Sequence, residues 1–165
     1  MDLFSASERL MTMSDKTWAR HANRWSVYTR FTCLPLIVLA IWSRVWIGWW
    51  AAPLVALAVI WTWYNPRAFP PAQRWDTWAA EGTMGERVFL GHRESIAPHH
   101  RRAAIVLTAG SAICLAPLVY GLWALNPWAT LLGIFTTIGP KAWFVDRMVW
   151  IWKDWEASGK TRADL

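Results

Sequence analysis

Two long stretches of this 165-residue sequence contain no acidic side chain. They span residues 16–75 and 95–145, and together they hold most of the apolar residues. Only 17% of the chain is charged, whereas soluble domains carry roughly 25% charged residues. A membrane-spanning helix needs about 20 mostly apolar residues, and both stretches are long enough to hold more than one. The sequence therefore predicts an all-α integral membrane protein and excludes a disordered, collagen-like or disulfide-rich chain.

Four apolar segments within these stretches are predicted to form transmembrane helices. The connections within the first pair and within the last pair are only a few residues long, so each pair is expected to form an antiparallel hairpin. Asn126 and Pro127 predict a tight turn and a helix start, because Asn caps helices and Pro suits the first helical position. The predicted helices cover residues 25–43, 48–64, 103–125 and 127–152.

Basic residues are concentrated at one end of the predicted hairpins. Of the 17 Lys and Arg residues, 15 lie before the first helix core, in the middle loop 65–102, or from Arg147 onward. The tight turns hold only Arg44, and Lys141 lies inside the fourth helix. Because basic loops stay in the cytoplasm, the sequence predicts a multi-pass protein of the cytoplasmic (inner) membrane with both termini and the middle loop inside.

The chain is expected to divide into three parts. A cytoplasmic or interfacial segment at 1–24 precedes a membrane domain at 25–152, and a cytoplasmic tail follows at 153–165. The first residues lack the pattern of a secretory signal peptide, so we expect an internal helix to direct insertion, and Met1, Met11 and Met13 are all possible starts.

Tryptophan is abundant, with 16 residues, and most of it is explained by two aromatic belts at the membrane–water interfaces. An indole ring places its body in lipid and its N–H among the headgroups. The outer belt is predicted to contain Trp42, Trp46, Trp49, Trp50, Trp123 and Trp128. The inner belt is predicted to contain Trp25, Trp61, Trp63, Tyr64, Trp150 and Trp152.

The middle loop is predicted to lie along the cytoplasmic interface. Three prolines within 65–71 are expected to end the second helix sharply. One short turn is expected over 76–81, closed by Gly82. Thr83 and Glu86 then fit a capping box, which predicts a short amphipathic, interfacial helix that ends near Leu90.

Polar side chains near this interface form the candidate site. Neutral His and carboxylates bind metals, and His is the usual general base near neutral pH. The spacing matches no familiar metal or catalytic motif, and the same His and Arg side chains can instead face lipid phosphates. The sequence names no cofactor. The candidate cluster comprises His21, Asn23, Arg30, Glu86, His99, His100, Lys141, Asp146 and Arg147. The candidate metal ligands among them are His21, His99, His100, Glu86 and Asp146.

Two charges within the fourth predicted helix support two interpretations. A charge inside a membrane helix is costly unless it is paired or reaches water. In the first interpretation Lys141 extends toward the cytoplasm and Asp146 pairs with Arg24, Arg30 or Arg147, which locks the helices together. In the second, both charges belong to a polar pocket between helices that opens to the cytoplasm.

Several motifs together resemble an uncharacterised bacterial and archaeal family of small Trp-rich membrane proteins. The resemblance covers residues 18–152, and the family usually has HANPWS where this chain carries Arg24 at the Pro position. It implies a multi-helix membrane protein in which His21, Asn23, Glu86, His99, His100, Asp146 and Arg147 matter, and it supplies no activity. The motifs are WARHANRWSVYTRF, IWSRVWIGWW, NPRAFPP, GERVFL, APHHRR and WFVDRMVW.

Three classes of function stay open on the sequence alone. The favoured class is a non-enzymatic membrane component, either an accessory subunit or a binder of a small ligand or lipid, because no catalytic spacing stands out. The alternatives are a small membrane enzyme acting on a lipid or quinone, with or without a bound metal, and an oligomeric small transporter. Expected partners are anionic lipid headgroups and further copies or a larger membrane complex, whereas nucleic acid is not expected.

Overall fold

The fold is built from helices and their connections. The computed structural model describes residues 14–165, and this part of the chain contains no β-strand, which confirms the predicted all-α class. The possible start sites and most of the predicted N-terminal segment lie outside the described residues. The elements are α2 (Asp15–His21), α3 (Arg24–Arg30), α4 (Cys33–Trp42), α5 (Arg44–Ile47), η1 (Gly48–Trp50), α6 (Ala51–Ala68), α7 (Trp78–Gly91), η2 (Arg93–Ser95), α8 (Pro98–Ile113), α9 (Leu115–Ala124), α10 (Pro127–Ala157) and η3 (Arg162–Asp164).

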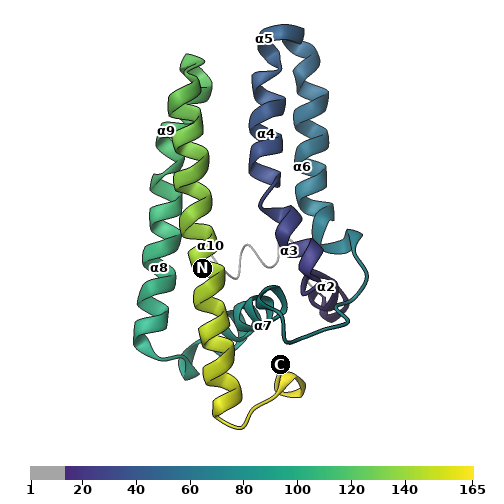
Figure 1. The fold of residues 1–165 in the computed structure, drawn as a ribbon, viewed down its shortest axis with the longest axis vertical. Coiled ribbons are helices and arrows are strands. Elements are labelled where there is room, and N and C mark those ends of the chain that lie inside the picture. The colour runs from purple at the N-terminus through teal and green to yellow at the C-terminus, as the bar shows by residue number, and fades with distance from the viewer. Residues whose placement is uncertain (1–13) are drawn as a thin grey trace.

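Two antiparallel helical hairpins stand side by side (Figure 1). In the first, α4 packs against α6, and in the second, α8 and α9 pack against α10. We call the end with the two hairpin turns the tip end and the opposite end the core end. Asn126 caps α10 by accepting from the Ala129 N–H at 3.0 Å, and Pro127 is the first helical residue, as predicted. At the tip end, Arg44 donates to the carbonyl oxygen of Leu122 and links the hairpins.

Two of the predicted continuous helices are divided, which corrects the sequence prediction. The segment 25–43 forms α3 and α4, and the segment 103–125 forms α8 and α9. Each break lies where a proline, Pro35 or Pro117, would have to donate to the carbonyl four residues earlier, and proline has no N–H to give. Each proline instead becomes the third residue of the following helix, where the first turn needs no such donor.

The second predicted helix is displaced toward the core end. It begins at Ala51, after a short 3₁₀ turn, and it continues through Pro66 to Ala68 instead of ending at residue 64. The helix ends at Phe69, whose backbone is extended (φ −103°, ψ 154°). A residue that precedes proline disfavours the helical conformation, and Phe69 precedes Pro70.

The middle segment contains one helix where the sequence predicted a turn and a separate helix. Helix α7 is capped by Thr77, whose hydroxyl accepts from the Ala80 N–H at 3.3 Å. Thr83 lies inside α7 and donates to the carbonyl of Ala79 at 2.9 Å, so the predicted capping box at Thr83 does not form. Gly82 also lies inside α7 and does not close a turn, and it faces α10.

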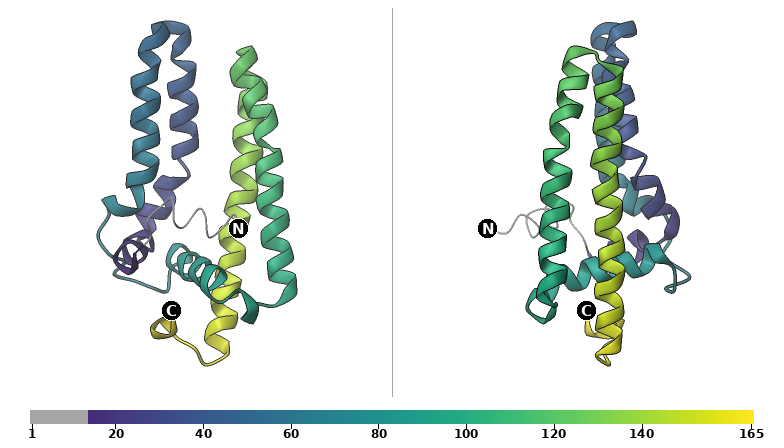
Figure 2. Two further views of the ribbon diagram at one scale, coloured as in Figure 1. Left: turned by 180° about the vertical axis from the view of Figure 1, so that it is seen from behind. Right: turned by 60° about the vertical axis from the view of Figure 1, so that its left-hand side comes forward.

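Helix α7 lies across the core end between the two hairpins (Figures 1 and 2). It packs against α10 on one side and against α2 and α3 on the other. A Cβ on Gly82 would come within 2.7 Å of a Val145 methyl carbon, and a Cβ on Gly85 would overlap the carbonyl oxygen of Met148. The two glycines therefore set how closely α7 approaches α10.

The buried hydrophobic core lies around α7 and α10. The core does not extend into the parts of the two hairpins near the tip end. It includes Trp155, which explains why α10 extends beyond the predicted end at residue 152 to Ala157. The core residues are Ala22, Ala80, Met84, Val88, Phe89, Ile96, Ala104, Phe144, Met148, Ile151, Trp152 and Trp155.

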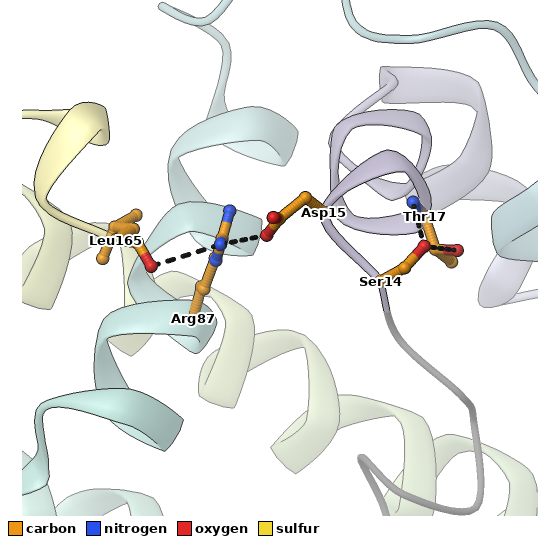
Figure 3. Close-up of polar contacts among 5 residues, drawn as sticks. All are labelled: Ser14, Asp15, Thr17, Arg87 and Leu165. Carbon is orange, nitrogen blue, oxygen red and sulfur yellow. Dashed lines mark hydrogen bonds and ion pairs between the residues drawn. The ribbon is translucent and has the colours of Figure 1, made fainter.

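Arg87 of α7 ties both ends of the described chain to the core (Figure 3). Its guanidinium pairs with Asp15 at the start of α2 and donates to the backbone oxygen of Leu165 at 3.2 Å. The C-terminal segment folds back beneath α10, where the Trp155 indole donates to the carbonyl of Thr161 at 3.2 Å. The tail is thus held against the core end.

Two helical segments among the described residues are long and apolar enough to cross a membrane. They are Arg24–Ala68, which folds back on itself as the first hairpin, and Pro98–Ala124. Only 17% and 11% of their most apolar windows are buried, unlike the core helices of soluble proteins. The segment predicted as the fourth span, within α10, is not among them.

Candidate functional site

A cavity of about 470 Å³ lies between the hairpins at the core end. This volume is within the range of roughly 300–1,000 Å³ that is typical of small-molecule sites. Residues of α2, α3, α4 and α6 form one part of the wall, and residues of α7 and α10 form the other. The wall comprises Trp18, His21, Val27, Arg30, Phe31, Cys33, Leu34, Ile37, Thr62, Gly82, Thr83, Glu86, Leu90, Lys141 and Val145.

Four of the predicted site residues meet in this cavity. His21 comes from the end of α2, Arg30 from the end of α3, Glu86 from α7 and Lys141 from α10. The four positions are separated by up to 120 residues along the chain, and the crossing of α7 between the hairpins brings them to one cavity. Apart from Thr62 and Thr83, the other lining side chains are apolar or small, so the polar groups occupy a limited part of the surface.

His21 is buried and neutral. Its Nδ1 lies 3.2 Å from the hydroxyl of Ser26, a fully buried residue at the start of α3. Burial and the positive charges of Arg30 and Lys141 lower the pKa of His21 to about 3. Because the imidazole carries no charge at physiological pH, it acts in the cavity wall as a hydrogen-bonding group and not as a cation.

The two cations of the cavity have few partners in the protein. The Lys141 ammonium lies 4.5 Å from the centre of the Phe144 ring, a cation–π contact. Within residues 14–165, neither Arg30 nor Lys141 forms a hydrogen bond or ion pair to an acceptor, although Glu86 lines the same cavity. Lys141 is therefore part of the pocket, as in the second interpretation of the sequence.

Two other histidines, His99 and His100, form a separate group between α8 and α10. His100 is buried, and its Nε2 lies 2.9 Å from a carboxylate oxygen of Asp154. Its Nδ1 lies 3.5 Å from a guanidinium nitrogen of Arg147, which can only donate, so the ring is expected to carry its proton on Nε2. The ring of the exposed His99 lies 4.1 Å from that of His100.

This second group adjoins a smaller cavity of about 170 Å³. His100 and Asp154 both line that cavity, together with residues of α7 and of the C-terminal segment. The Nε atom of Arg147 is buried and has no hydrogen-bond partner among the described residues. The group holds α8 against the end of α10, which is a structural role.

Asp146 joins three helices through an aromatic partner. It accepts from the Trp78 indole N–H at 3.1 Å, and within the described chain it takes part in no ion pair. The Trp78 ring is stacked on that of Tyr28, with centroids 6.4 Å apart and planes 10° apart. The expected pairing of Asp146 with Arg24, Arg30 or Arg147 therefore does not form among the described residues, and Asp146 instead links α10 to α7 through Trp78.

The candidate metal ligands do not converge, which corrects the hypothesis of one metal-binding cluster. His21 and Glu86 line the large cavity, His100 lies in the second group, and Asp146 binds Trp78. In the described part of the chain, no three His, Cys, Asp or Glu side chains are arranged to hold a metal ion. The physical reason is that α7 and α10 separate the two histidine groups.

Asn23 has a local structural role. Its side-chain oxygen accepts from the Trp25 N–H at 2.9 Å and caps α3, and its amide donates to the carbonyl of Pro70 at 3.1 Å. These bonds fix the α2–α3 corner that carries His21. The sequence did not single out Trp18 or Thr83 as cavity residues or Asp154 as the partner of His100, because only the three-dimensional path of α7 and α10 brings them there.

The fold and the cavity together define a small two-hairpin helical protein with a mostly apolar pocket of about 470 Å³. The chain belongs to a family of unknown function (DUF6653), whose family model matches residues 6–164. This confirms the resemblance to an uncharacterised family. No curated protein and no solved structure matches the chain.

Proposed function

We propose that the protein spans the cytoplasmic membrane four times and binds a small amphipathic ligand in the cavity between its hairpins. Both hairpins expose large apolar side chains that water would not solvate well but that lipid would. At the tip end, the exposed fraction reaches 94% for Trp49 and 78% for Trp123 and Trp128. Exposed Trp25, Trp63 and Trp150 lie toward the core end, where the basic residues are concentrated.

The cavity carries the proposal of ligand binding. It is lined by both hairpins, it has a mostly apolar wall, and it contains six polar side chains, of which two are cations without acceptors in the described chain. Ligand sites of this kind combine an apolar surface with a few polar groups that fix orientation. A non-enzymatic binder fits the site, because Ser26, whose hydroxyl lies 3.2 Å from His21 Nδ1, is fully buried and holds the ring.

The orientation follows from the charge distribution. Reporter fusions at Gly48 and Asn126 are expected to give a periplasmic signal, and fusions at Gln73 and after Leu165 a cytoplasmic signal, because the core end carries almost all the basic residues. An alkaline phosphatase and green fluorescent protein pair measures both sides. A periplasmic signal at Gln73 would contradict both the orientation and the assignment of the spans.

Filling the cavity is expected to remove the ligand without unfolding the protein. Ile37 lines the cavity, whereas Leu39, two residues further along α4, is 63% exposed. The Ile37→Trp variant should lose co-purified ligand about tenfold or more, and the matched Leu39→Trp variant should keep it. Native mass spectrometry of protein purified in a nonionic detergent measures the bound mass. Equal ligand content in Ile37→Trp and the wild type would contradict the proposed function.

A further inference from the structure

The two cations of the cavity come from opposite hairpins. Arg30 is the last residue of α3, and Lys141 lies inside α10. Both line the cavity, and neither has a carboxylate or carbonyl partner within the described residues. A cation within a membrane-spanning segment is costly unless it is paired or hydrated. An anionic group between the two helices would remove this cost for both side chains at once.

The neighbouring groups favour an acid over a neutral or basic ligand. His21 presents a neutral ring beside the two cations, and its Nδ1 is already engaged by Ser26. Glu86 lines the same cavity but lies beyond ion-pair distance of Arg30 and Lys141. Two positive charges and one negative charge leave the cavity with an excess of one positive charge. This excess complements an anionic headgroup.

The rest of the cavity wall is apolar and continues along the first hairpin. Leu34 and Ile37 follow Arg30 along α4, and Leu90 and Val145 face them from α7 and α10. A ligand held at Arg30 would therefore place its apolar part against these side chains. The volume of about 470 Å³ lies toward the lower part of the range for small-molecule pockets, which fits one acyl chain better than two.

We propose that the cavity binds a single-chain anionic amphipath, with its acid group between Arg30 and Lys141 and its acyl chain against the apolar wall. This proposal rests on the proposed function, since it names the ligand class of the same cavity. The shared chemistry of the ligand is an acid headgroup on one acyl chain, and the head is either a carboxylate or a phosphate. Arg forms bidentate hydrogen bonds to both groups, and Lys contributes a point charge.

The test measures retention of defined probes by purified, delipidated protein. Palmitate and a lysophosphatidate of equal chain length supply the two headgroups, hexadecanol supplies the chain alone, and inorganic phosphate supplies a head alone. Native mass spectrometry in a nonionic detergent counts the bound molecules. At least one acid probe is expected to bind one to one and about tenfold or more tighter than hexadecanol, and the preferred acid identifies the headgroup. Hexadecanol bound as tightly as both acids, or phosphate retained as strongly as the acyl probes, would overturn the proposal.

Variants separate this proposal from the proposed function. Arg30→Gln and Lys141→Gln are each expected to weaken the acid probe at least tenfold while leaving hexadecanol unchanged. Arg30→Lys keeps the charge but loses the bidentate geometry, so it should weaken the acid probe less than Arg30→Gln does, and unchanged binding of hexadecanol shows that the fold tolerates change at this position. Lys153→Gln, an exposed cation outside the cavity, should bind as the wild type does.

Three outcomes would contradict the proposals, and they distinguish the headgroup assignment from the cavity itself. If Ile37→Trp abolishes retention but Arg30→Gln and Lys141→Gln bind the acid probe normally, the headgroup assignment is wrong and the cavity remains a ligand site. If Ile37→Trp leaves retention of every probe unchanged, the cavity is not the binding site, and both proposals fail. One molecule of a two-chain phospholipid retained in preference to the single-chain acids would also contradict the assignment.

Discussion

Replacing Gly85 by alanine is expected to destabilise the protein by about 3 kcal/mol, the upper end of the usual cost of overpacking a core. A Cβ at this position would overlap the carbonyl oxygen of Met148, a backbone atom that no rotamer change can move. Helix α7 would have to move away from α10 and open the packing of Met84, Val88 and Phe89. The thermal midpoint of unfolding in one nonionic detergent measures the effect.

Gly91 provides the matched control for this prediction. It is the last residue of the same helix, and a Cβ there would meet no atom within 4 Å. The Gly91→Ala variant should therefore keep the wild-type midpoint, since a substitution at an open surface position usually changes stability by less than about 0.5 kcal/mol. Equal midpoints for Gly85→Ala and Gly91→Ala would mean that α7 does not pack against α10 as closely as described.

Acidification from pH 7.5 to pH 5 is expected to destabilise the wild-type protein by about 2 kcal/mol through His21 alone. The pKa of His21 is lowered to about 3 in the folded protein, whereas an unfolded histidine titrates near 6.5. Between these values the unfolded chain binds a proton that the folded chain does not, so stability falls as the pH falls below 6.5.

The variant His21→Gln isolates the contribution of this residue. Glutamine keeps a hydrogen-bonding group near Ser26 and does not titrate, so the difference in thermal midpoint between pH 7.5 and pH 5 should shrink. His99→Gln removes an exposed imidazole and should keep the wild-type difference. The measurement stops at pH 5, where most carboxylates are still ionised. An unchanged pH dependence in His21→Gln would show that His21 is not buried in the folded state.

The hairpins were predictable because local signals define them. The acid-free apolar segments predicted the helices of the two hairpins. Asn126 and Pro127 predicted the second turn and the start of α10, and the structure confirms that turn and that start. The effect of each proline was less predictable. Pro35 and Pro117 coincide with helix breaks, whereas α10 continues through Pro140. Whether a proline breaks a helix depends on whether neighbouring groups satisfy the freed carbonyl, and that depends on tertiary contacts.

The residues of the candidate site were predictable, but their grouping was not. All nine predicted residues lie at or next to the core end, yet only His21, Arg30, Glu86 and Lys141 share the large cavity. Their meeting depends on the crossing of α7 between the hairpins, which depends in turn on the fit of its glycines against α10. That fit joins positions about 60 residues apart, and no local pattern encodes it.

The position of the hydrophobic core constrains the order in which the chain can assemble. Helix α7 is made before α10, its principal packing partner, so a nascent chain that has completed only the first hairpin carries α7 with its glycine-rich face uncovered. Lys141 and Val145 complete the cavity wall only when α10 has been synthesised. The pocket can therefore form only after α10 has been synthesised, and a chain truncated before α10 would present an unpaired hairpin and an uncovered α7 to the cell's quality control.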